Sequence, residues 1–252
     1  MPVFDFSAKN YIVTGGAGSI GRAIVEGIVE CGGNVYAIDI DVKTLAEMEE
    51  ELGTEKYHFR ALDLSSPETI RKCFAEIIAE VGQLHGLVNC VGILSTTKFE
   101  DITQEEWDKV LSINLTGVFA ANQSVYSHMC SNRYGRIVNV SSVAGKVGGG
   151  LMGRGAYATT KAALNGMTKV IAKEGGKYNV CCNCVCPGWT DSRMINDLMT
   201  DADTERLRNM VALGRRATPQ EAANPVLFYL SDLASFVTGE VSDVDGGVVY
   251  DG

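Results

Sequence analysis

The 252-residue chain has little of what marks several special classes of protein. It contains only five prolines, three histidines and two tryptophans. No segment approaches the roughly 18 unbroken apolar residues of a membrane-spanning helix, and the start, MPVFDFSAKN, lacks the apolar stretch of a secretory signal. The composition excludes a collagen-like or disordered chain, and we expect a globular protein of the cytoplasm.

Positive charge is also in short supply. Lys and Arg together number 22 against 31 Asp and Glu, which gives a net charge of -9. Surfaces that bind nucleic-acid backbones or anionic lipids need the opposite balance. We therefore predict no nucleic acid and no membrane as partner, and a small molecule as substrate.

Cysteine is the exception to these low counts, with eight residues, four of them in the segment CCNCVC at 181–186. Their spacing lacks the gap of a zinc-ligand pair, and the three histidines are scattered. Cys182, Cys184 and Cys186 alternate, so in a strand they share one face. We predict reduced cysteines that pack as small apolar residues, and no metal site.

Short runs rich in β-branched residues alternate with longer stretches in which apolar residues have helical spacing. The runs cover residues 11–14, 34–39, 58–62, 86–90, 136–140, 180–185 and 240–244. Such alternation predicts parallel strands joined by helical crossovers. The fold class is therefore α/β: a single doubly wound (Rossmann) domain over residues 1–252, with helices on both faces of the sheet. A charged, irregular segment near 190–216 should form a substrate loop and short helices over the carboxyl edge.

A glycine-rich segment, TGGAGSIG at 14–21, joins the first predicted strand to a helix. Glycines such as Gly15 allow positive φ and let a pyrophosphate approach the backbone N–H groups of a helix N-terminus. Asp39 ends the second predicted strand, close to the spacing expected for a carboxylate that binds an adenosine ribose. A carboxylate repels a 2′-phosphate, and neither the turn nor Ile40 offers a cation. We therefore predict NAD rather than NADP as cofactor.

The segment YATTK places Tyr157 and Lys161 on one helix face, where an ammonium favours the ionised form of a phenol. It follows the strand RIVNVSS, which ends in Ser141 and Ser142. These residues, together with TGGAGSIG, NCVG, INLTG, PGWTDS and VDGG in that family order, resemble the short-chain dehydrogenase/reductase family from residue 10 to residue 247.

The resemblance implies a catalytic tetrad of Asn114, Ser142, Tyr157 and Lys161. Tyr157 would exchange a proton with the substrate oxygen, and Lys161 would lower the pKa of Tyr157 and hold the nicotinamide ribose. Ser142, favoured over Ser141 by the family spacing, would donate a hydrogen bond to the reacting oxygen. Asn114 would hold a water that links Lys161 to solvent.

The resemblance also implies where the cofactor lies. Asn89 is open to a second interpretation, as is Asn114, because buried amides often serve only to satisfy backbone groups. The implied contacts are Gly15, Ser19 and Ile20 at the pyrophosphate, Asp39 and Asn89 at the adenosine ribose, Asp63 and Leu64 near the adenine, Tyr157 and Lys161 at the nicotinamide ribose, and Thr190 near the carboxamide or phosphates.

We therefore predict an NAD(H)-dependent oxidoreductase that interconverts a secondary alcohol and a ketone, acting on a sugar or polyol or on a hydroxysteroid-like alcohol. Two alternatives remain: an NADP(H)-dependent 3-oxoacyl-type reductase, and a dinucleotide-binding regulator without catalysis. The resemblance further implies a homo-oligomer, commonly a tetramer. Candidates for the substrate wall are the apolar residues Leu94, Leu151, Met152, Trp189 and Met194 and the cations Arg154 and Arg193.

Overall fold

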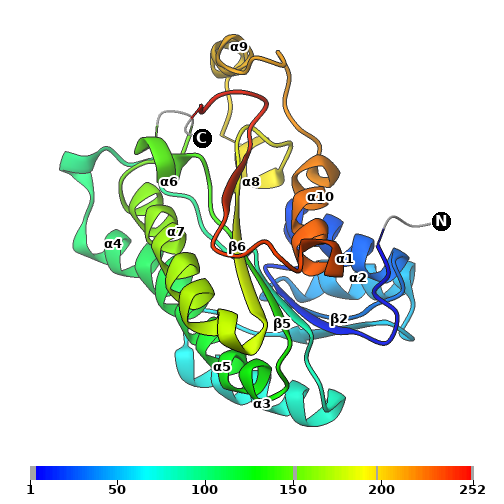
Figure 1. The fold of residues 1–252 in the computed structure, drawn as a ribbon. Coiled ribbons are helices and arrows are strands. Elements are labelled where there is room, and N and C mark those ends of the chain that lie inside the picture. Colours follow the sequence, from blue (N-terminus) through cyan, green and yellow to red (C-terminus); the bar gives the residue numbers. More distant parts are fainter. Residues whose placement is uncertain (1–3, 150–151, 197, 251–252) are drawn as a thin grey trace.

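The fold is built on one parallel sheet of seven strands in the order β3-β2-β1-β4-β5-β6-β7 (Figure 1). The computed structural model describes residues 4–149, 152–196 and 198–250. Each predicted run forms a strand whose ends differ from the prediction by at most two residues, which confirms the fold class. The strands are β1 (Asn10–Thr14), β2 (Asn34–Asp39), β3 (Tyr57–Ala61), β4 (Gly86–Asn89), β5 (Gly135–Val140), β6 (Val180–Pro187) and β7 (Val241–Val244).

Helices cover both faces of this sheet, with α1, α2 and α10 on one face and α3, α5 and α7 on the other (Figure 1). A π-helical turn, Ser112–Gly117, separates α4 from α5. The helices are α1 (Ser19–Glu30), α2 (Val42–Leu52), α3 (Pro67–Val81), α4 (Gln104–Leu111), α5 (Val118–Ser131), α6 (Ala144–Val147), α7 (Gly155–Gly175), α8 (Arg193–Asn196), α9 (Asp201–Met210) and α10 (Pro219–Leu230).

Two apolar layers hold the helices on the sheet. On one face, Ile24 and Ile28 of α1 are fully buried with Val226 of α10. On the other, Ile70 and Phe74 of α3 pack among residues of α5 and the central strands. Each fully buried side chain of this kind contributes roughly 1.5–3 kcal/mol, so the two layers fix the strand ends that carry the site.

The cysteines of β6 pack as predicted. The thiols of Cys184 and Cys186 both lie near the amide oxygen of Asn165 on α7, at 3.4 and 3.9 Å, and Cys182 contacts Asn139 at 3.7 Å. All eight cysteines are free thiols. Among the described residues, no group of three or more His, Cys, Asp or Glu side chains is arranged to hold a metal ion.

The carboxyl ends of the strands form an open crevice at the point where the strand order reverses, between β1 and β4. Ligands of doubly wound sheets bind at such a point. The segment 190–216, described except for residue 197, carries α8 and α9 and lies above this edge (Figure 1). A bridge between Thr190 and Ala217 joins the start of the segment to the residue that follows its end. We call this segment the lid. No helix in the described part of the chain is long and apolar enough to cross a membrane.

Candidate active site

In the glycine-rich turn the N–H groups of residues 15–18 are already hydrogen-bonded, so the N–H groups left for an anion are those of the first turn of α1. Gly15 has a φ of 70°, and a Cβ on it would lie 2.6 Å from the backbone nitrogen of Val91. Gly21 is equally constrained, because a Cβ there would collide with the carbonyl oxygen of Gly15. Helix α1 begins after Gly18 without a side-chain cap. The free N–H groups and the helix dipole therefore form a cradle for an anion.

Asp39 lies beside this cradle at the end of β2. Its Oδ2 accepts a 3.1 Å hydrogen bond from the backbone N–H of Ala17, and its Oδ1 accepts one of 3.1 Å from Asp41. Each carboxylate oxygen keeps a second lone pair. The carboxylate is thus fixed against the turn and remains able to accept hydroxyl donors from a ribose.

Ser142, Tyr157 and Lys161 converge on the other side of the crevice. Ser142 follows β5, and its Oγ accepts a 3.1 Å hydrogen bond from the N–H of Ala144. Tyr157 and Lys161 lie one turn apart on α7, with the ammonium 5.7 Å from the centre of the phenol ring. Lys161 is buried and donates a 2.9 Å hydrogen bond to the carbonyl of Val140, which holds it against the end of β5.

The pKa of Tyr157 differs from the prediction that Lys161 lowers it. Burial raises the pKa of Tyr157 above its ordinary value, and a hydrogen bond with Ser142 acts in the opposite direction. Burial also lowers the pKa of Lys161. The ammonium of Lys161 donates to a backbone carbonyl, and the hydrogen bond with Ser142 is the interaction that favours the ionised tyrosine.

Asn114 lies in the π-helical turn and is fully buried. Its amide oxygen accepts a 2.8 Å hydrogen bond from the N–H of Ile93, and its amide nitrogen donates one of 2.9 Å to the carbonyl of the same residue. A Cβ on Gly92 would lie 3.1 Å from the Lys161 ammonium and 3.5 Å from the Asn114 amide oxygen. Asn114 therefore positions the segment that passes beside Lys161, and its link to solvent through a water stays a prediction.

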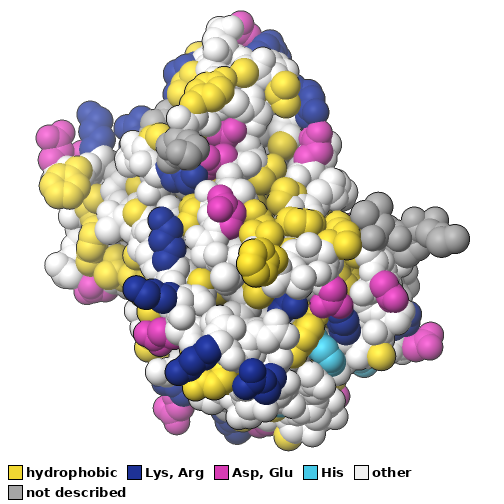
Figure 2. All heavy atoms as spheres, in the orientation of Figure 1, with side chains coloured by type: hydrophobic (Ala, Val, Ile, Leu, Met, Phe, Trp, Pro, Cys, Tyr) yellow, Lys and Arg dark blue, Asp and Glu magenta, His cyan; other side chains and the backbone are white. Residues whose placement is uncertain are grey.

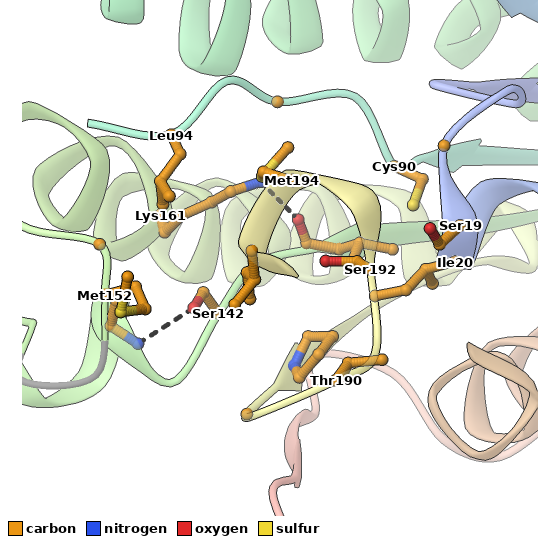
Figure 3. A pocket seen from close by; sticks show the side chains of 18 of the residues that line it. Ser19, Ile20, Cys90, Leu94, Ser142, Met152, Lys161, Thr190, Ser192 and Met194 are labelled. Atoms are coloured by element: carbon orange, nitrogen blue, oxygen red, sulfur yellow. Dashed lines mark hydrogen bonds between the residues drawn. The ribbon is translucent and has the colours of Figure 1, made fainter. Parts of the chain in front are cut away.

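The structure separates the two candidate serines. Ser141 is buried, and its hydroxyl donates a 2.7 Å hydrogen bond to the carbonyl of Lys161. Ser142 is half-buried and points into the cleft (Figure 3). This placement agrees with the choice of Ser142 as the catalytic serine.

Asn89 lies elsewhere than expected. Its amide donates 3.1 and 3.0 Å hydrogen bonds to the side chains of Asn122 and Asn139, inside the sheet. Only 1% of Asn89 is exposed, so this side chain crosslinks β4, α5 and β5 and does not face an adenosine ribose. The side chain thus has the structural role of a buried, bonded amide, and a contact of residue 89 with the cofactor stays a prediction.

Two further predicted residues lie at the end of β3. The Asp63 carboxylate accepts a 2.8 Å hydrogen bond from the N–H of Ser65, and Leu64 is buried against α3 and the central strands. Both follow the strand that pairs with β2, on the side of the crevice where Asp39 lies. Their contact with an adenine stays a prediction.

The cleft that joins these groups has a volume of about 190 Å³ and is mainly apolar. In Figure 3, Leu94, Met152, Ser142 and Lys161 lie at one end, and Ser19, Ile20 and Cys90 lie at the other. Leu151, also predicted for the substrate wall, lies outside the described residues. Ser192, which the sequence reasoning did not select, lines the cleft from the lid. The signal was its position at the end of PGWTDS, two residues before Met194.

Thr190, the first residue of the lid, lines the same cleft. It is 2% exposed, and its hydroxyl is buried without a hydrogen-bond partner among the described residues. A buried unpaired hydroxyl is costly unless a ligand group satisfies it. The anion cradle and this free hydroxyl line one cleft, and the Asp39 carboxylate is bonded to Ala17 beside the cradle. Together these groups fit a dinucleotide.

The fold and the cleft define a dinucleotide-binding oxidoreductase with a serine, a tyrosine and a lysine at one end. Residues 15–249 match the family model described as Enoyl-(Acyl carrier protein) reductase. The chain belongs to the short-chain dehydrogenase/reductase family, whose members use a nicotinamide dinucleotide and act on CH–OH and keto groups.

Similar proteins indicate the kind of substrate to consider. The chain is 38% identical over 243 residues to the 3-oxoacyl-(acyl-carrier-protein) reductase FabG of Aquifex aeolicus, covering 95% of this chain and 97% of that protein. It is 34% identical over 242 residues to the acetoacetyl-CoA reductase of Shinella zoogloeoides, with 95% and 98% covered. These names favour the 3-oxoacyl-type alternative over the sugar, polyol or hydroxysteroid that we predicted first.

A solved structure shares the whole fold. A short-chain dehydrogenase/reductase from Brucella melitensis, described as a glucose/ribitol dehydrogenase, superimposes with a TM-score of 0.91 at 29% identity. The match covers 98% of this chain and 99% of that one. The arrangement of strands, helices and lid is therefore that of the family.

Proposed function

We propose that the protein interconverts a 3-oxoacyl and a 3-hydroxyacyl thioester with NAD(H) as the hydride carrier. The observation that carries the cofactor choice is the Asp39 carboxylate, fixed against the turn by the N–H of Ala17 at 3.1 Å. A carboxylate accepts hydrogen bonds from the 2′- and 3′-hydroxyls of a ribose and repels a phosphate at the same position. The substrate class is supported by the two reductases of acyl thioesters that resemble the chain over 95% of its length.

The apolar wall supports an acyl chain as the occupant of the substrate end. Leu94, Met152 and Met194 line the cleft together with Ser142 (Figure 3). Trp189 lines it as well. A sugar or polyol needs many hydrogen-bond partners in its site, since buried hydroxyls are costly when they are unpaired. The wall instead offers mostly apolar surface to a ligand.

The catalytic side chains then have distinct tasks. The Tyr157 hydroxyl donates its proton to the substrate oxygen during reduction and accepts it during oxidation. The Ser142 hydroxyl donates a hydrogen bond to the same oxygen, where negative charge develops. The Lys161 ammonium holds positive charge beside both groups. Nicotinamide, when bound, supplies or accepts the hydride.

This proposal is tested by the absorbance of reduced nicotinamide in the presence of acetoacetyl-CoA and either NADH or NADPH. We expect consumption of NADH that depends on acetoacetyl-CoA, with slower or no turnover of polyols and hydroxysteroids in the presence of NAD⁺. Turnover of a polyol or a hydroxysteroid, without turnover of acetoacetyl-CoA, would contradict the thioester substrate and favour an alcohol dehydrogenase. Tight NADH binding without turnover of any substrate would favour the regulator.

The edge of the sheet supports assembly with further copies of the chain, most simply as a tetramer. Among the described residues β7 pairs only with β6, which leaves one edge of the strand open. Phe236 is fully exposed and Leu233 is 66% exposed beside α10. Figure 2 shows hydrophobic side chains gathered on this face. Light scattering of the purified protein gives the copy number, and a monomer would contradict this assembly.

A further inference from the structure

The lid places a cation on the glycine-rich turn. Arg193, the first residue of α8, donates a 3.0 Å hydrogen bond from Nη2 to the carbonyl oxygen of Ala17. Its backbone N–H also approaches the Ser19 hydroxyl oxygen at 3.4 Å. The two partners are 176 and 174 residues away in the sequence. Folding of the lid thus gives the turn a guanidinium that the turn itself lacks.

This guanidinium lies on the adenosine side of the turn. Ala17, which accepts from Arg193, also donates its N–H to Asp39. The pKa of Asp41 is lowered by hydrogen bonds from Thr44 and further by the charge of Arg193. The arginine therefore shares Ala17 with Asp39 at the end of β2, where the 2′ position of an adenosine ribose would be recognised.

We propose that Arg193 recognises the 2′-phosphate of NADP(H), so that the protein binds NADP(H) as well as NAD(H). This inference rests on the proposed dinucleotide site. A guanidinium forms paired, charge-assisted hydrogen bonds with a phosphate and offsets the repulsion from Asp39. With NAD(H), Asp39 accepts the ribose hydroxyls and Arg193 keeps its bond to Ala17. The lid arginine therefore sets how strongly the protein discriminates between the two cofactors.

Arg22 is the rival cation, and its contacts make it the matched control. Beside the glycine-rich turn there is a hollow that is lined by both Arg22 and Arg193. Ala17, Ser19 and Glu47 also line it. The Nε of Arg22 donates a 2.7 Å hydrogen bond to Glu26, and its Nη2 is paired with Glu51. Two carboxylates already neutralise Arg22, whereas the Arg193 side chain donates to a backbone carbonyl.

The test measures dissociation constants of NADH and NADPH by nucleotide fluorescence or calorimetry for the wild-type protein, Arg193→Gln, Arg193→Lys and Arg22→Gln. We expect Arg193→Gln to weaken NADPH by about tenfold or more, with NADH changed by less than about twofold. Arg193→Lys should recover part of the NADPH affinity, because the charge is kept without the planar fork. Arg22→Gln should leave both constants unchanged.

A second pair of ligands separates the 2′-phosphate from the pyrophosphate. Adenosine 2′,5′-bisphosphate and adenosine 5′-monophosphate both lack a pyrophosphate and differ only at the 2′ position. Arg193→Gln should weaken binding of the bisphosphate alone. If Arg193→Gln weakened the binding of NADH and NADPH equally, Arg193 would contact the pyrophosphate. If Arg22→Gln weakened the binding of NADPH, Arg22 would hold the 2′-phosphate. Either result overturns the inference.

Failure of the dinucleotide site itself gives a different result. In that case the wild-type protein binds neither NADH nor NADPH. Wild-type protein that binds NADH but shows no measurable affinity for NADPH overturns the role of Arg193 while leaving the proposed function in place.

Discussion

The hydroxyl of Ser141 donates a 2.7 Å hydrogen bond to the backbone carbonyl of Lys161. This bond joins the end of β5 to the second turn of α7, one residue before Ser142, the proposed catalytic serine. Lys161 returns a 2.9 Å bond from its ammonium to the carbonyl of Val140. The pair of bonds fixes Ser142 opposite Tyr157, although the two residues lie on separate elements.

Tyr157→Phe should remove turnover and keep cofactor binding. The change deletes only the hydroxyl that exchanges the proton, and general acid–base catalysis contributes roughly a hundredfold or more to a rate. We therefore expect a loss of at least about a hundredfold in kcat, with the NADH dissociation constant unchanged. Substantial residual turnover would show that another group carries the proton.

The oxidation rate should rise with pH and have no plateau near neutrality. Tyr157 must be deprotonated to accept a proton, and burial raises its pKa above the ordinary value of 10.0. The fraction of ionised tyrosine therefore increases throughout the range from about pH 7 to 9. A pH–rate profile that levels off below pH 8 would contradict a raised pKa.

Ser142→Ala should move the same profile to higher pH. The hydrogen bond with Ser142 lowers the pKa of Tyr157, whereas burial raises it. Without that bond the pKa of Tyr157 should therefore be higher. The oxidation rate should be lower at every pH and should begin to rise at a higher pH than in the wild-type protein. Ser141→Ala offers a comparison, because its hydroxyl contacts the Lys161 carbonyl and not the phenol. An identical shift in both variants would rule out a specific effect of Ser142.

Asp39→Ala should weaken NADH more than NADPH. The carboxylate supplies the acceptors for the ribose hydroxyls, and its removal also removes repulsion of a 2′-phosphate. We expect the ratio of the two dissociation constants to change by about tenfold in favour of NADPH. Glu47→Gln, which removes an exposed charge of α2 beside the same hollow, is the control. An unchanged ratio would remove the basis for choosing NAD.

Gly21→Ala should disrupt the turn. The added Cβ would collide with the carbonyl oxygen of Gly15, and backbone on both sides prevents relief. Overpacking of this kind costs about 1–3 kcal/mol of unfolding free energy, and NADH binding should weaken with it. Gly166→Ala on α7 meets no atom within 4 Å and should stabilise the protein by roughly 0.5–1 kcal/mol. Thermal melting measures the change in stability of each variant, and calorimetry measures its affinity for NADH.

Local patterns in the sequence were sufficient for the fold and for much of the catalytic end of the site. The seven strands follow from short β-branched runs, because a strand covered on both faces must be apolar throughout. Ser142, Tyr157 and Lys161 follow from motifs in which each residue lies on a predictable element. The register between β5 and α7 then needs only the bond from Ser141 to Lys161.

Contacts between distant segments were beyond the reach of such patterns. Asn89 ends a strand like a ligand-binding residue, but Asn122 and Asn139 engage its amide from the interior. Arg193 looked like a substrate contact, yet the lid carries it to Ala17 on the opposite side of the crevice. Neither outcome depends on local spacing, because both partners come from other elements of the fold.

The π-helical turn that carries Asn114 has a consequence for how the chain tolerates change in length. A π turn accommodates one residue more than an α-helix of the same rise, so α4 and α5 are out of phase by about 100°. Deleting one residue from Ser112–Gly117 would let the two helices merge into a continuous α-helix. The hydrogen bonds of Asn114 to Ile93 would then be lost even though no catalytic side chain had been altered.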